Sequence, residues 1–144
     1  MVQRIAYHRS FGMMFFSLLL IGAIKCDKNF NPLGSPKVCP LPLNETVEIG
    51  YKETAKNSDE NISLTFDALI SDSRCPIGLR CVIAGYVEIA FIFNSVPFPL
   101  QCNQDTTIGH YNIRLVDVDP YPDIDSTYTK EDYAAEVIVT KIPL

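Results

Sequence analysis

Short segments in which apolar and polar residues alternate constrain the fold of this chain more than any other feature. From Ile62 to Ile70, apolar side chains fall on one side of an extended chain and polar ones on the other. Such period-two alternation is typical of a strand with one buried face. The same pattern predicts strands at 46–52, 82–93, 111–118 and 133–142, and a short edge strand at 100–103. One helical turn is expected at 129–133, where Thr129 can cap it.

Clusters of Gly, Pro, Asn and Asp separate these segments. Residues 55–61 have the composition of a turn, 94–99 break the pattern, and 119–130 form a long polar loop around two prolines. Short strands joined in this way predict an all-β fold, either a single antiparallel β-sandwich or a partly open barrel.

The first 25 residues have the composition of a signal peptide. Arg4 and Arg9 form a basic front, and the uncharged run Phe11–Ile24 is shorter than the roughly 20 residues that span a membrane. We therefore assign 1–25 to a signal peptide, 26–43 to a proline-rich tether and 44–144 to the β-sandwich domain. An N-terminal helix that is buried or anchors the chain in a membrane is the alternative.

Cys26 follows a segment similar to a bacterial lipobox, although Lys25 stands where that motif has a small residue. Lipidation of Cys26 would leave four of the five cysteines for two disulfide bonds. We therefore predict a lipoprotein of the bacterial cell envelope, anchored in a membrane and facing the periplasm or the exterior. Cleavage near Ala23 would instead give a secreted protein with Cys26 as an extra thiol.

Cys75 and Cys81 enclose Pro76 and Gly78 in a short loop that a disulfide bond can close. Such a bond places the protein in an oxidising compartment. Because these two cysteines are local partners, the second predicted bridge joins Cys39 to Cys102. A zinc site or a redox-active pair are the alternatives, but zinc sites space their cysteines more closely and redox pairs of the thioredoxin kind have two intervening residues.

The residues around this loop also carry a resemblance. Asp72–Pro76 reads DSRCP, and Cys81 follows after four residues and precedes Val-Ile-Ala-Gly. This block resembles a group of small secreted or lipoprotein bacterial domains of unknown function, over roughly residues 45–142. Ile83 stands where the group usually has tryptophan, and the pair Cys39 and Cys102 is additional to the group's pattern. The resemblance implies an exported β-rich domain and supplies no substrate, cofactor or catalytic residue.

Loop 71–81 is the candidate binding loop, with Asp72, Arg74 and Arg80 as its candidate contact residues. Functional contacts favour loops on rigid scaffolds, and Arg74 and Arg80 would then project as a recognition surface. The structural interpretation is favoured over this one, because Asp and Ser at a turn readily hydrogen-bond their own backbone. Asp72 is then expected to accept hydrogen bonds from loop amides, and Arg74 to pair with a nearby carboxylate.

Four carboxylates, Asp117, Asp119, Asp123 and Asp125, gather around one strand end and loop. Oxygen ligands of this kind suit calcium, but the spacing is not that of an EF-hand, so a solvated acidic loop is the default interpretation.

Other function classes lack support in the sequence. His110 is the single histidine after the signal segment, and no nucleophile elbow, P-loop or pair of catalytic glutamates is recognisable, so we predict no enzyme, no catalytic residue and no cofactor. The formal net charge is −5, and the signal segment contains only basic charges, so nucleic-acid binding is not expected. We expect a structural or binding role at the cell envelope. The alternatives are an exported inhibitor or ligand-binding module that presents loop 71–81, and a calcium-dependent surface protein.

Overall fold

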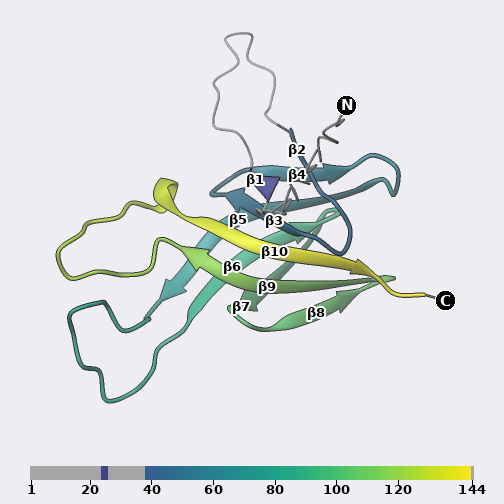
Figure 1. The fold of residues 1–144 in the computed structure, drawn as a ribbon. Coiled ribbons are helices and arrows are strands. Elements are labelled where there is room, and N and C mark those ends of the chain that lie inside the picture. Colours follow the sequence, from purple (N-terminus) through teal and green to yellow (C-terminus); the bar gives the residue numbers. More distant parts are fainter. Residues whose placement is uncertain (1–23, 26–37, 144) are drawn as a thin grey trace, which may run out of the picture.

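The computed structural model describes residues 24–25 and 38–143 (Figure 1). These residues form ten strands and one turn of 3-10 helix. The elements are β1 (Ile24–Lys25), β2 (Val38–Pro40), β3 (Thr46–Gly50), β4 (Thr54–Asn57), β5 (Ile62–Asp72), β6 (Val87–Phe93), β7 (Val96–Gln101), β8 (Asp105–Ile108), β9 (Tyr111–Asp119), η1 (Lys130–Asp132) and β10 (Ala134–Lys141).

The strands form two five-stranded sheets with the orders β1-β3-β10-β9-β8 and β2-β4-β5-β6-β7. The two sheets pack together and do not close into a barrel, which confirms the predicted all-β sandwich. Most neighbouring strands are antiparallel, as predicted. The two outermost pairs, β1 with β3 and β2 with β4, are parallel.

The core lies between the sheets and follows the alternation of the sequence. Burial alternates without a break along β6 and through most of β10. Most apolar residues that the alternation places on one face of a strand are buried: Val47, Ile49, Ile62, Leu64, Phe66, Val87, Ile89, Phe91, Phe93, Ile113, Leu115, Ala135, Val137 and Val139. Tyr51, Ala68 and Tyr111, which the alternation places on the same faces, are only half-buried. The alternation in β5 ends at Phe66, because register shifts against β6 follow at Phe66/Ala68 and Leu69/Ser71. Such irregularities change which face a side chain joins, and Ile70 is half exposed.

The structure has strand residues where the sequence pattern indicated none. β4 occupies part of the segment read as a turn, and β7 covers residues 96–99 of the segment read as a break as well as the first two residues of the edge strand predicted at 100–103. Pro97 and Pro99 are compatible with β7 because it is the last strand of its sheet, where one backbone side has no ladder to join. β6 starts at Val87 instead of Val82, and residues 82–86 belong to a loop.

Residues 38–43 are part of the sandwich. Val38–Pro40 pairs with β4, and Cys39 and Leu41 are both 2% exposed. Asn57 fastens this segment further, because its side-chain amide donates to the carbonyl of Leu41. The packed domain therefore includes residues that their proline content had placed in the tether. The rest of the predicted signal segment and tether, 1–23 and 26–37, lies outside the described residues.

Candidate binding surface at the loop end

Two long loops lie beside each other at one end of the sandwich, on the left in Figure 1. The first, residues 73–86, joins β5 to β6, and the second, residues 120–133, joins β9 to β10 and contains η1. Backbone hydrogen bonds connect them: the Ile77 amide donates to the Pro122 carbonyl, and the Ile124 amide donates to the Ile77 carbonyl. We call these two loops together the loop end.

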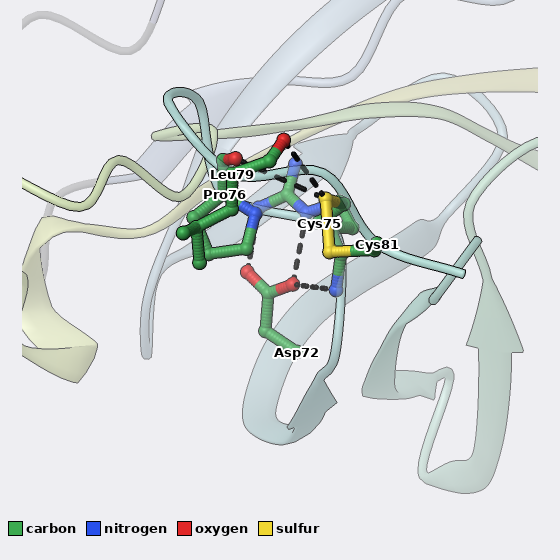
Figure 2. Close-up of a disulfide and its surroundings, with 6 residues drawn as sticks. Asp72, Cys75, Pro76, Leu79 and Cys81 are labelled. Carbon is green, nitrogen blue, oxygen red and sulfur yellow. Dashed lines mark hydrogen bonds and ion pairs between the residues drawn. A yellow bond between two sulfur atoms is a disulfide. The ribbon is translucent and has the colours of Figure 1, made fainter. Parts of the chain in front are cut away.

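The predicted disulfide between Cys75 and Cys81 is present, with the two Cα atoms 5.9 Å apart (Figure 2). The ring that it closes contains Gly78, whose φ of 91° lies in the left-handed region that glycine tolerates best. The Ile124 side chain fills the space where a Cβ at Gly78 would lie. The second loop therefore packs directly on the disulfide ring.

The base of the first loop is closed by a narrow neck. The Ser73 amide donates to the Tyr86 carbonyl at 2.9 Å, and the Tyr86 amide donates to the Ser73 hydroxyl at 3.1 Å. Gly85 lies so close to the Ser73 carbonyl that a Cβ at this position would overlap it. This close backbone approach holds the two ends of the loop together.

A buried ion pair lies beneath the disulfide. The Arg74 guanidinium donates to both carboxylate oxygens of Asp72, at 2.9 and 2.7 Å, and the Arg74 amide donates to the same carboxylate (Figure 2). The two side chains are only 8% and 7% exposed. Tyr133 adds a fourth donor, since its hydroxyl lies 3.2 Å from Asp72 Oδ2.

Arg74 also fastens the second loop. Its guanidinium donates to the carbonyls of Val118 and Pro120, at 2.6 and 2.8 Å, and lies 4.8 Å from the centre of the Tyr121 ring. The interpretation of Arg74 as a projecting recognition residue is wrong, because these contacts hold its guanidinium inside the protein. The favoured structural interpretation is confirmed, since Arg74 pairs with a carboxylate and Asp72 accepts a hydrogen bond from a loop amide. Arg80 is the one residue of the predicted trio that is exposed.

The ion pair fixes the charge state of both partners. Burial raises the pKa of Asp72, but the hydrogen bonds and the charge of Arg74 outweigh this effect, so the pKa of Asp72 lies below its ordinary value. Burial lowers the pKa of Arg74, and the hydrogen bonds and charge of Asp72 raise it to a net value above the ordinary one. Both groups therefore remain charged at neutral pH.

Large apolar side chains are exposed on the two loops of the loop end. Val82 is 102% exposed and Ile83 81%, which means that neither packs against the protein. The exposed apolar residues of the two loops, which we call the apolar tip, are Ile77, Leu79, Val82, Ile83, Tyr86, Tyr121, Ile124 and Tyr128. No charged residue occurs between Cys81 and Val87.

The predicted bridge between Cys39 and Cys102 is wrong. Cys39 is disulfide-bonded, but Cys102 is a free thiol that donates to the Val116 carbonyl. Cys39 lies in β2 and Cys102 directly follows β7, at opposite edges of the same five-stranded sheet. Strands about 4.8 Å apart put these edges far beyond the roughly 7 Å between Cα atoms that a disulfide can span. Burial and the neighbouring Asp117 raise the pKa of the Cys102 thiol.

The calcium candidate is not supported by the placement of its carboxylates. Within residues 24–25 and 38–143, no three His, Cys, Asp or Glu side chains gather in a way that could hold a metal ion. Asp117 instead accepts from the Val118 amide, and Asp123 accepts from the Asp125 amide. These are turn and strand-end contacts of a solvated acidic loop.

The remaining sites predicted from the sequence are placed as follows. Cys26 and its predicted lipid lie outside the described residues. His110 lies in the turn between β8 and β9, where its carbonyl accepts from the Ile142 amide. Among the described residues, no helix has the length and apolar character needed to cross a membrane. The expected helical turn is present as η1, and the Asp132 carboxylate accepts from the Thr129 amide and hydroxyl at its start.

In comparisons with protein-family models, with curated proteins and with solved structures, nothing matched this chain.

Proposed function

We propose that this protein is an exported binding module that contacts another protein through the apolar tip. The observation that carries this proposal is the full exposure of Val82 and Ile83 on a loop whose base is held by a disulfide, a neck and a buried ion pair. Folding gains nothing from apolar side chains in water, and neighbouring large apolar side chains that are both fully exposed, as Val82 and Ile83 are, are typical of interaction sites.

The rigidity of the loop supports the same function. Binding through a mobile loop loses free energy when the loop becomes ordered, and a preorganised loop avoids most of that loss. A disulfide, a buried ion pair and a close glycine contact hold the first loop in place, although the residues that make them contribute no side chain to the core. This arrangement fits a surface kept in one shape for a partner. No enzymatic activity or cofactor is part of the proposal.

A pulldown with matched variants tests this function. The full mature protein is immobilised without reductant, and proteins that crosslink to it from its native extract are compared with those of Val82→Asp/Ile83→Asp. Val96→Asp is the control, because Val96 is also exposed but is the first residue of β7, outside both loops of the loop end. We expect one partner to be recovered with wild type and control, and at least 10-fold less with the double variant. Equal recovery with all three proteins contradicts the proposal.

We propose separately that the protein is exported from the cytosol. The Cys75–Cys81 disulfide supports export, because such bonds persist in oxidising compartments. The sequence argument for a lipid on Cys26 was that the other four cysteines would then form two disulfide bonds. Cys102 is a free thiol, so this argument no longer supports lipidation. Mass spectrometry of the mature protein separates the possibilities. A diacylglycerol-modified N-terminal Cys26 supports the membrane anchor, and Cys26 recovered in a disulfide with Cys39 excludes it.

A further inference from the structure

The charges around the apolar tip narrow the class of partner, provided that the proposed function holds. Asp119, Asp123, Asp125 and Glu131 all belong to the second loop or its border, and three of them are exposed while Asp123 is half-buried. We call these four residues the acidic rim. Asp123 and Asp125 flank Ile124, so two carboxylates border an exposed apolar residue of the tip itself.

The acidic rim has no ion pair with any other residue that the structure describes. Among the described residues, the ion pairs are Lys52–Asp67, Arg74–Asp72 and Lys141–Glu60, and none involves the rim. Arg74, which precedes Cys75, is already paired with Asp72. Arg80 on the disulfide ring and Lys130 beside Glu131 are the exposed cations of the described loop end, against four carboxylates of the rim. The apolar tip is therefore bordered by a net negative charge.

We infer that the partner is a protein surface with an apolar centre and a basic border. Complementary charges at an interface rim speed association and reject wrong partners, and the apolar centre supplies most of the affinity. An anionic membrane surface is the competing occupant of an exposed apolar loop. It attracts basic segments, and the carboxylates next to Ile124 would be repelled by its surface charge.

A peptide-display selection tests this inference. A random 16-residue peptide library is selected against the full chain without reductant, and each selected peptide is then measured against Val82→Asp/Ile83→Asp. We expect peptides that combine aliphatic or aromatic residues with Lys and Arg, and that lose at least 10-fold in affinity on the double variant. Asp123→Asn/Asp125→Asn should weaken them about 5-fold at low salt, and this difference should vanish at 1 M salt, where the Debye length is about 3 Å.

Matched controls keep the outcomes distinct. Asp59→Asn/Glu45→Gln removes two exposed carboxylates away from the loop end and should leave peptide affinity unchanged. Tip-dependent peptides that are neutral or acidic overturn the inferred partner class and leave the proposed function standing. Peptides that bind wild type and Val82→Asp/Ile83→Asp equally contradict the proposed function itself. Failure to select any peptide, or tip-dependent sedimentation of the protein with phosphatidylglycerol vesicles, overturns the inference of a basic protein partner.

Discussion

Removing the Arg74 side chain should strongly destabilise the protein. Its guanidinium makes four hydrogen bonds, two to the Asp72 carboxylate and two to the carbonyls of Val118 and Pro120. Arg74→Met leaves Asp72 charged at 7% exposure with no cation beside it. Breaking a buried ion pair from one side costs about 3–5 kcal/mol, and we expect a loss in this range.

A double-mutant cycle checks the physical reason for that loss. Asp72→Leu should cost a similar amount, because it leaves the guanidinium buried without its counter-charge. The combined variant removes both charges and leaves mainly two carbonyls unpaired, at about 1–3 kcal/mol each, so it should lose much less than the sum of the two single changes. If the two losses simply add, the ion pair is not the source of the effect.

The measurement is urea unfolding at pH 7 without reductant, followed by circular dichroism because the chain has no tryptophan. Arg80→Met is the matched control, since Arg80 is an exposed arginine on the same loop, and its unfolding free energy should equal that of wild type. Should Arg74→Met fail to fold, Arg74→Lys keeps the charge without the planar fork and gives an intermediate loss. An Arg74→Met variant within about 1 kcal/mol of wild type would refute the reasoning.

Four further outcomes follow from the same contacts. The pKa of Asp72 is lowered in the folded state, so ionised Asp72 stabilises the folded protein above the ordinary aspartate pKa of about 4, and this stabilisation is lost as pH falls below that value. The difference in unfolding free energy between wild type and Asp72→Asn should therefore become smaller when urea unfolding is repeated from about pH 6 down to about pH 3. Cys75→Ser/Cys81→Ser should lose about 2 kcal/mol in urea unfolding, since the bridge closes a short loop with a sequence separation of 6 residues, and no loss would mean that the neck alone orders the loop. Iodoacetamide labelling followed by peptide mapping should modify Cys102 and not Cys75 or Cys81, slowly at pH 7 and faster at pH 9 because the pKa of Cys102 is raised; a Cys102 that is recovered in a disulfide would contradict the free thiol. Gly85→Ala should lower the free energy of unfolding by more than about 1 kcal/mol, as its Cβ would overlap the Ser73 carbonyl, whereas Ala84→Ser next to it should be neutral.

The sandwich was predictable wherever strands bury one face. Alternation in β6 and β10 selected the correct inward residues, and in β5 and β9 it did so except at Ala68 and Tyr111, because a buried face imposes a period of two on the sequence. Edge strands are under a weaker constraint. β7 buries only Leu100 fully and carries two prolines, and β8 buries none of its residues, so neither has an alternating signature.

The loop end was predictable in its local chemistry and not in its long-range contacts. Cys75 and Cys81 are six residues apart, so the sequence alone suggests their pairing. The carbonyls that bind Arg74 come from positions 44 and 46 residues further along the chain, and no pattern in the sequence marks them. The same reason explains the error at Cys39 and Cys102. The number and spacing of cysteines in the sequence do not reveal the strand order, which puts Cys39 and Cys102 at opposite edges of one sheet.

The neck between Ser73 and Tyr86 has a practical consequence. It closes below residues 76–84 and is made by backbone groups and one hydroxyl, so none of its hydrogen bonds depends on which side chains follow above it. Sequence variation and short insertions between Cys81 and Gly85 should then be tolerated without unfolding the strands beneath. The sandwich is accordingly suited to directed evolution of new specificities, with positions 82–84 randomised and the remaining residues kept.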